Sequence, residues 1–152
     1  MKIAVVSDTH NNWTNFKKAI EWIKKEEIRL ILHCGDISSQ ETIDDAKKLF
    51  DGEIKFVKGN ADWGLDLPDE LDLEFNKKKI AFVHFPNEAK KLAQSGKFDM
   101  VFYGHTHRPW DEKIGDCHMI NPGEMAGQFY KPSFAVYDTA SDKLELKILE
   151  TL

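Results

Sequence analysis

The sequence predicts an α/β fold in which two mixed β-sheets pack together, with helices on their outer faces. Short apolar runs alternate with amphipathic helical segments in the first part of the chain. This βαβαβ order is typical of a parallel sheet with right-handed crossovers. After His107 the pattern changes to short strands joined by turns. With 152 residues, 41% of them hydrophobic, the chain is expected to form a single domain over residues 1–152 with an ordinary core.

The expected parallel sheet is built from three strands and two helices. In chain order these are a strand at 2–6, a helix at 12–26, a strand at 30–33, a helix at 40–50 and a strand at 54–57. The first helix is predicted from apolar residues at i, i+3 and i+4 spacing, namely Trp13, Phe16, Ala19, Ile20 and Ile23. The second helix has Ser38 or Ser39 as its candidate N-cap.

The rest of the chain favours strands. A loop rich in Gly, Asp and Pro at 59–70 precedes a hairpin of 73–75 and 79–84, a short helix at 86–94 and a strand at 100–103. Further strands are expected at 110–114, 117–120, 133–137 and 144–149. In the last of these, Leu144, Leu146 and Ile148 alternate with charged residues, so one face should be buried.

Composition argues against several classes of protein. The net charge is −5 without a basic stripe, which argues against general nucleic-acid binding. No apolar run approaches the ~20 residues that a membrane helix requires. The N-terminus leads directly into the first strand, which leaves no room for a cleaved signal sequence. Cys34 and Cys117 have no disulfide spacing and are expected to be small buried side chains of a reduced, cytoplasmic protein.

Side chains that bind metals follow most of the strands in the first two-thirds of the chain. They are Asp8 and His10 after the first strand, Asp36 after the second, Asn60 and Asp62 after the third, His84 after the hairpin, and His105 and His107 after the strand at 100–103. The carboxyl ends of strands gather at one edge of an α/β sheet, where ligands bind. The pattern therefore predicts one shared site with enough oxygen and imidazole ligands for two metal ions.

Each motif has an ordinary structural explanation when taken alone. Asp8 could cap the following helix, and His10 could lie in a turn. The Gly-Asp and Gly-Asn pairs are common turn sequences, and His84 alone would more often be a half-buried histidine than a ligand. His105 and His107 are more specific, because two imidazoles just past a buried strand must each find a partner. The ordinary explanations become poor when all the motifs occur together.

In this order the motifs resemble those of the calcineurin-like metallophosphoesterase superfamily. The residues that carry the resemblance are Asp8-x-His10, Gly35-Asp36, Gly59-Asn60-x-Asp62, His84, Gly104-His105-x-His107 and the turn Asn121-Pro122-Gly123. The compact length resembles the small bacterial and archaeal phosphodiesterases of that superfamily. The resemblance implies a four-layer αββα sandwich and a two-metal site. One metal would be held by Asp8, His10, Asp36 and His107, and the other by Asp36, Asn60, His84 and His105, with Asp36 bridging.

Such a site implies metal-dependent hydrolysis of a small phosphate-ester substrate, with phosphodiesters favoured. Two cations polarise phosphoryl oxygens and lower the pKa of a water held between them, which attacks as hydroxide. Asp36, Asn60 and His105 are the candidate catalytic residues. The mixture of nitrogen and oxygen ligands suits two divalent transition-metal ions, with Mn, Fe, Zn, Ni and Co all open. A homo-oligomer is also left open.

Three positions depart from the pattern of the superfamily. Many members have a histidine directly after the Asn, thought to help the leaving group, but this chain has Ala61 and so lacks the obvious general acid. The family's His-Gly-His is His84-Phe85-Pro86 here, and the usual Ser after Asn-Pro-Gly is Glu124. The alternative function is a metal-binding interaction scaffold of the same fold, as in a retromer subunit. The complete ligand set favours an enzyme.

Several residues beside the motifs allow two interpretations. Asp62 is expected to orient a neighbour rather than to bind metal. Arg108 is expected either to contact a phosphate oxygen or to form an ion pair at the rim. Trp63 and Trp110 could stack on a base, although ordinary packing is the commoner role of such residues. His33 lies outside the motifs and is expected to have no role as a ligand.

Overall fold

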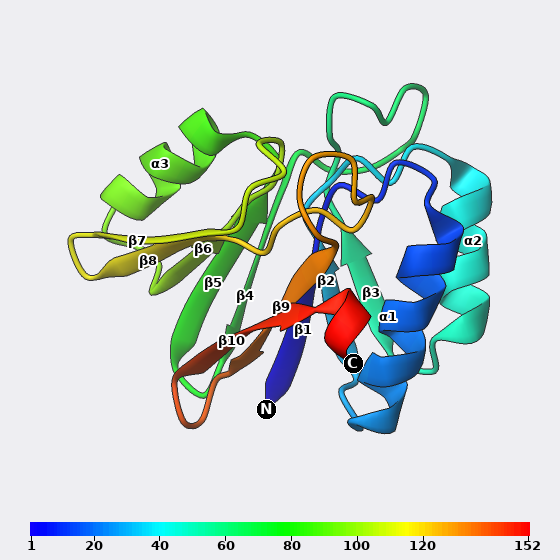
Figure 1. The fold of residues 1–152 in the computed structure, drawn as a ribbon. Helices are drawn as coiled ribbons and strands as arrows, with labels where there is room; N and C mark the ends of the chain where they lie inside the picture. Colours follow the sequence, from blue (N-terminus) through cyan, green and yellow to red (C-terminus); the bar gives the residue numbers. More distant parts are fainter.

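The computed structural model describes residues 1–152 and contains two five-stranded sheets. Their strand orders are β10-β9-β1-β2-β3 and β4-β5-β6-β8-β7 (Figure 1). The strands are β1 (Lys2–Val6), β2 (Leu30–His33), β3 (Glu53–Phe56), β4 (Glu70–Phe75), β5 (Lys78–Val83), β6 (Met100–Phe102), β7 (Trp110–Ile114), β8 (Cys117–Asn121), β9 (Ser133–Asp138) and β10 (Lys143–Ile148). The helices are α1 (Trp13–Lys25), α2 (Gln40–Leu49) and α3 (Pro86–Gln94), and a 3₁₀ turn at Leu149–Thr151 follows β10.

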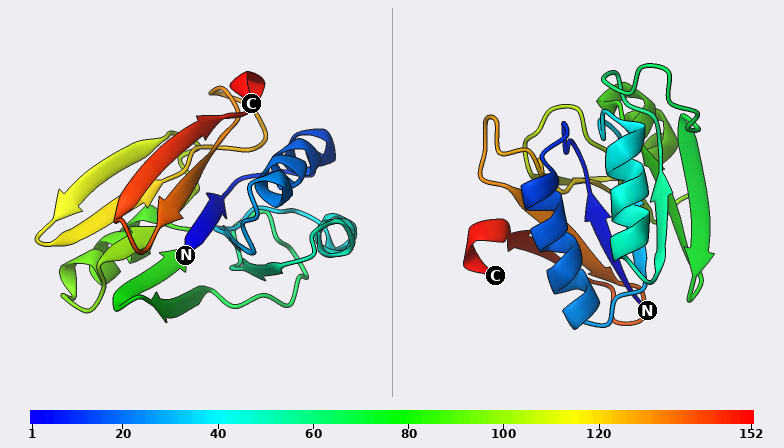
Figure 2. Two further views of the ribbon diagram at one scale, coloured as in Figure 1. Left: turned by 90° about the horizontal axis from the view of Figure 1, so that it is seen from below. Right: turned by 90° about the vertical axis from the view of Figure 1, so that its right-hand side faces the viewer.

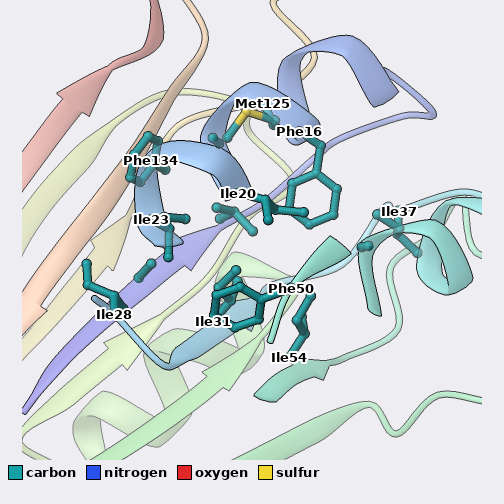
Figure 3. Packing of buried hydrophobic residues seen from close by; sticks show 14 of the residues in the cluster. Phe16, Ile20, Ile23, Ile28, Ile31, Ile37, Phe50, Ile54, Met125 and Phe134 are labelled. Atoms are coloured by element: carbon teal, nitrogen blue, oxygen red, sulfur yellow. The ribbon is translucent and has the colours of Figure 1, made fainter. Parts of the chain in front are cut away.

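The sheets face each other, and helices cover both outer faces. Helices α1 and α2 lie side by side over the first sheet (Figure 2), where Phe16 of α1 and Ile31 of β2 belong to one buried cluster (Figure 3). Between the sheets, Leu32 of β2 and Phe82 of β5 belong to a second cluster. Helix α3 covers the second sheet through Ala89 and its neighbours. The architecture is therefore the four-layer αββα sandwich that the resemblance implied.

Parallel pairing places the ends of the central strands together. Strands β1, β2 and β3 run parallel in the first sheet, and β5, β6 and β8 run parallel in the second. The loops that follow β1, β2 and β6 meet in the upper middle of Figure 1. This is the edge at which α/β sheets usually bind their ligands.

The predicted elements are all present, with small shifts at their ends. Asn12 caps α1 by accepting a hydrogen bond from the backbone of Asn15, and Ser39 rather than Ser38 caps α2. Strand β4 begins at Glu70, inside the segment predicted as a loop, because it pairs with β5 over its whole length. Its sequence alternates charged and apolar residues that are only half-buried, so its hydrophobic signal is weak. The last strand ends at Ile148, where the 3₁₀ turn begins.

Cys34 and Cys117 are both buried and unpaired, as expected. None of the helices combines the length and the apolar character that crossing a membrane would require.

Candidate metal centre

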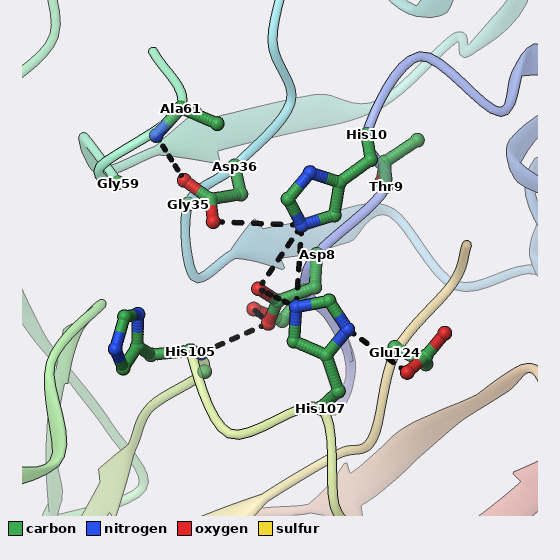
Figure 4. A network of polar contacts seen from close by, with 12 residues as sticks. Asp8, Thr9, His10, Gly35, Asp36, Gly59, Ala61, His105, His107 and Glu124 are labelled. Atoms are coloured by element: carbon green, nitrogen blue, oxygen red, sulfur yellow. Dashed lines mark hydrogen bonds and ion pairs between the residues drawn. The ribbon is translucent and has the colours of Figure 1, made fainter. Parts of the chain in front are cut away.

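The predicted ligands come from both sheets and converge at one place. Asp8 and His10 follow β1, Asp36 follows β2, Asn60 follows β3, His84 follows β5, and His105 and His107 follow β6. Ligand atoms of Asp8, His10 and His107 lie within 4.8 Å of one another (Figure 4), and so do those of Asp8, Asp36 and His84. The structure thus forms two adjoining groups, each able to hold an ion.

In the first group, one carboxylate oxygen lacks a hydrogen-bond donor. Oδ1 of Asp8 is buried and accepts no hydrogen bond; the nearest imidazole nitrogens are Nε2 of His107 at 3.3 Å and Nε2 of His10 at 3.6 Å. Its other oxygen accepts from the Ser7 hydroxyl at 2.7 Å and from the backbone of His105 at 3.0 Å. A buried carboxylate oxygen without a donor is costly unless a cation satisfies it. These residues therefore fit a metal ion.

In the second group, an aspartate and an asparagine each face two imidazoles. Oδ2 of Asp36 lies 3.2 Å from Nε2 of His84 and 3.5 Å from Nε2 of His10. Oδ1 of Asn60 lies 2.9 Å from Nε2 of His84 and 3.0 Å from Nδ1 of His105. The carboxylate of Asp36 thus reaches an imidazole of each group. The amide oxygen of Asn60 adds a neutral ligand to the second.

Hydrogen bonds on the far side of two imidazoles determine which nitrogen faces the site. Nδ1 of His84 donates to the carbonyl of Cys34 at 2.8 Å, and Nδ1 of His107 donates to the carboxylate of Glu124 at 2.9 Å. In both rings Nε2 is left to bind metal. Glu124 is fully buried and also accepts from two backbone amides of the loop that follows it.

The charges in the site stabilise each other. Burial would raise the pKa of Asp8, but the imidazoles of His10 and His107 outweigh it and hold the pKa of this carboxyl well below its usual range. The same contact with Asp8 raises the pKa of His107 to about 8. Burial would lower the pKa of His84, but the neighbouring Asp36 outweighs it and raises that pKa. Metal binding would therefore displace protons from imidazoles while the carboxylates stay ionised.

The backbone holds most of the ligands in an uncommon conformation. The left-handed φ values are 53° at Asp8, 46° at His10, 61° at Asp36, 73° at His105 and 64° at His107. Residues in this region cost about 1–3 kcal/mol each and cluster at functional sites. The backbone also approaches Asp8 closely at Gly104, where a Cβ would lie 2.6 Å from Oδ2 of Asp8. Only glycine fits there.

Asp62 holds two of the ligand loops together. Its buried carboxylate accepts from the backbone amides of Asp36 at 2.9 Å, Ser38 at 2.8 Å and Gly59 at 2.7 Å. This is the orienting role that the sequence suggested.

The other residues beside the motifs have varied surroundings. The guanidinium of Arg108 lies over the ring of Trp110, 4.5 Å from its centroid, and not in an ion pair at the rim. Its contact with a phosphate oxygen stays a prediction. Trp63 is 87% exposed, so ordinary packing was the wrong expectation for it. His33 is buried and accepts from the backbone of Gly35, as an interior residue.

Sequence reasoning missed some of the close contacts of the site. It singled out Glu124 only as a departure, and nothing placed it beside His107, 17 positions away. It also missed the ring of Phe129, whose centroid lies 5.3 Å from that of His107, and the packing of Phe85 at 5.1 Å from His105. The position of Phe85 directly after His84 was a usable signal, but Phe129 had none.

Comparison with known proteins shows the family of this chain. Residues 1–142 match the calcineurin-like phosphoesterase superfamily domain. The chain belongs to this superfamily. It is 31% identical to phosphodiesterase MJ0936 of Methanocaldococcus jannaschii, with 99% of this chain and 100% of that protein aligned. A solved structure of an archaeal phosphodiesterase has a TM-score of 0.88 at 28% identity, covering 97% of this chain and 99% of that one.

A less similar solved structure shows a likeness of fold alone. The structure of Vps29 from Entamoeba histolytica in complex with zinc has a TM-score of 0.76 at 19% identity, covering 98% of this chain and 99% of that one. Membership of the calcineurin-like phosphoesterase superfamily supports a metal-dependent phosphoesterase and implies divalent metal ions. The clustered aspartates and histidines are the candidate ligands.

Proposed function

We propose that this calcineurin-like phosphoesterase is a phosphodiesterase with a binuclear metal centre. The observation that carries the proposal is Oδ1 of Asp8, a buried carboxylate oxygen that no group of the protein satisfies and that faces His10 and His107. The relatives described as phosphodiesterases support the choice of a diester substrate.

The two metals would share the ligands as the resemblance implied. The first is assigned Asp8, His10, Asp36 and His107, and the second Asp36, Asn60, His84 and His105. By distance Asp8 adjoins both groups. Asp36 is nevertheless the better bridge, because its Oδ2 faces one imidazole of each group, whereas the free oxygen of Asp8 faces two imidazoles of the first. A shared carboxylate offsets the repulsion between the cations.

One step of the reaction, the protonation of the leaving group, lacks a side chain to assist it. When bound, the two cations would activate a water and polarise phosphoryl oxygens. His105 is the most exposed of the ligand imidazoles, so it is within reach of an incoming ester. Ala61 has only a methyl group where a histidine would supply a proton, and its backbone amide donates to Oδ1 of Asp36 at 2.7 Å. The leaving group would therefore depart without an acidic side chain beside it.

This proposal predicts a steep dependence of rate on the leaving group. The metal-loaded protein should hydrolyse methyl nitrophenyl phosphate quickly and methyl alkyl phosphates slowly. Ala61→His should raise the rate on poor leaving groups by about 10²-fold, the lower end of what a general acid contributes. A rate series over leaving groups of rising pKa tests this, with Asp111→Asn as a surface control. A flat series that Ala61→His leaves unchanged would contradict it.

The alternative function is a metal-binding scaffold. It is favoured by the fold shared with Vps29 and by the missing general acid at Ala61. The same experiment separates the two functions. If metal analysis finds both ions but the protein hydrolyses no ester, the phosphodiesterase function is excluded and the scaffold function remains.

A further inference from the structure

Three of the five exposed aromatic side chains of this protein, Trp63, Phe85 and Phe129, lie beside predicted ligands of the candidate metal centre. The other two exposed rings are those of Trp110 and Tyr130. Trp63, Phe85 and Trp110 lie in loops or at a strand start just after predicted ligands, and Phe129 and Tyr130 lie in the loop after β8. All other aromatic rings are buried or half-buried. Exposed rings that gather beside a candidate site indicate a surface that binds a ligand.

One of these rings lines a hollow next to a predicted ligand. The hollow has a volume of about 220 Å³ and is lined by Lys58, Gly59, Asn60, Asp62, Trp63 and Gly64. Because Oδ1 of Asn60 lies 2.9 Å from His84 and 3.0 Å from His105, the hollow adjoins the second ligand group. It belongs to the loop between β3 and β4, at the top of Figure 1.

We propose that this hollow binds a planar substituent of the diester, a nucleobase or an aryl ring, stacked on Trp63. The proposal rests on the phosphodiesterase function and names the substrate class. An indole stacks on any flat ring, because every base has a π-face. The hollow also contains Lys58, whose ammonium can donate to the carbonyl oxygens or ring nitrogens of a base. A nucleobase uses both features, and an aryl ring uses only the first.

A small ester fits this surface better than a macromolecule. The exposed rings stand on separate loops, with exposed polar residues such as Asn60, Thr106 and Arg108 near them in the chain. Protein interfaces instead have an apolar core that is poor in charged groups. A long nucleic acid would need a basic surface, and the net charge is −5.

The test compares diesters that share one leaving group. Metal-loaded protein is given the nitrophenyl esters of thymidine 5′-phosphate, phenyl phosphate and ethyl phosphate, and kcat/KM is measured for each. The native protein should prefer the thymidine and phenyl esters over the ethyl ester. Trp63→Ala should reduce both preferences about tenfold, the loss of one stacked ring. Trp63→Phe should keep most of them. Lys58→Ala should lower only the preference for thymidine over phenyl. Leu146→Ala, an exposed apolar side chain on β10, is the control that should change no ratio.

The outcomes separate this inference from the function on which it rests. Turnover with the same ratios in the native protein and Trp63→Ala would overturn the stacking site and leave the phosphodiesterase intact. If no ester is hydrolysed, the indole resonance of Trp63 is followed by NMR during titration with methyl thymidine 5′-phosphate. A shift of that resonance, which its absence from Trp63→Phe assigns to Trp63, would support the site although the function had failed, and no shift would overturn it. Equal preferences for thymidine and phenyl esters would assign the hollow to aryl rings.

Discussion

At the scale of single residues, Glu124 departs from the family pattern and contacts a ligand of the proposed metal site. Its buried carboxylate accepts from Nδ1 of His107 and from backbone amides of the loop that carries Phe129. A carboxylate behind a metal-binding imidazole fixes the orientation of the ring and makes it a stronger ligand. The usual serine has no charge to contribute.

Glu124→Gln and Glu124→Ser should therefore weaken metal binding at the first group. We expect a loss of about 10–100-fold in affinity, the range seen for such partners of ligands. Isothermal titration of the metal-free protein with Zn²⁺ measures it, and nitrogen NMR of His107 reports without metal whether Nδ1 keeps its proton. Asp111→Asn is the matched control, because Asp111 pairs with His118 outside the site. Unchanged affinity and an unchanged His107 spectrum would contradict the role of Glu124.

His33 should make the fold sensitive to acid. Burial lowers its pKa to about 3 in the folded protein, against 6.5 ordinarily. At a pH between these two values, the unfolded chain therefore binds a proton that the folded protein does not bind. The resulting loss of unfolding free energy is absent above pH 6.5 and grows by about 1.4 kcal/mol for each pH unit below it, until the folded pKa is reached. His107 has the opposite sign, since its raised pKa of about 8 adds stability that is complete below pH 6.5 and is lost as the pH rises through 8.

Denaturant unfolding of metal-free protein at pH 6.5 and pH 5 isolates this effect, because the contribution of His107 does not change in that window. We expect His33 to account for about 2 kcal/mol of the loss in unfolding free energy. His33→Asn should be less stable at pH 6.5, since it loses the ring that donates to Thr9, but its further loss at pH 5 should be smaller by that amount. Equal losses in both proteins would show that His33 does not carry the acid sensitivity.

At the scale of elements, the site depends on two loops that hydrogen bonds hold together. The loop after β2 carries Asp36 and the loop after β3 carries Asn60. Asp62 joins them by accepting three backbone amides. Hydrogen bonds to a buried charge are worth about 1.5–3 kcal/mol each, and an unsatisfied buried amide costs a similar amount.

Asp62→Asn places an amide group where backbone N–H groups point at the native carboxylate. The expected result is a loss of about 2–4 kcal/mol in unfolding free energy, together with weaker metal binding as Asp36 loses its orientation. Urea unfolding and metal titration measure the two effects. Asp44→Asn, on the exposed side of α2 where it pairs with Gln40, should change neither. A stable variant with native metal affinity would show that the two loops keep their positions without the carboxylate of Asp62.

The elements themselves were accessible from the sequence, because each is encoded by neighbours along the chain. The spacing of Phe16, Ile20 and Ile23 defines α1, and a serine caps α2. Strand β4 was harder to delimit, since its half-buried residues have no continuous apolar face. The left-handed backbone at Asp8 and His107 was not accessible at all, because no local preference of Asp or His requires it.

At the scale of the whole molecule, the sequence was sufficient to predict candidate ligands but not the side chains that contact them. Strand ends place the ligands at one edge, as parallel pairing requires. The contact of Glu124 with His107, and the exposure of Trp63, depend on how the loops pack after the sheets have formed. No periodicity or residue spacing in the sequence indicates such contacts. They are visible only in the folded structure.

The proposed metal centre also spans the two sheets of the sandwich. Asp8, His10, Asp36 and Asn60 come from the first sheet, whereas His84, His105 and His107 come from the second. Bound ions should therefore clamp the sheets together and stabilise the whole fold. A metal at 100 times its dissociation constant adds about 2.7 kcal/mol, so two would add about 5 kcal/mol. For a domain of this size that corresponds to a rise of about 10–20 °C in Tm.

Calorimetry of metal-loaded protein before and after removal of metal with EDTA measures this rise. Asp36→Asn should lose most of it, because both ions lose their shared anion, and His10→Ala should lose only the share of the first ion. His118→Ala, outside the site, should keep all of it. The comparison of variants is decisive because the two assignments differ in how many ions the replacement of Asp36 weakens. If Asp36 bridges, its replacement weakens both ions at once; if it serves one ion alone, Asp36→Asn and His10→Ala should cost the same number of degrees. Equal, partial losses would therefore reject the bridge while leaving each ligand group intact.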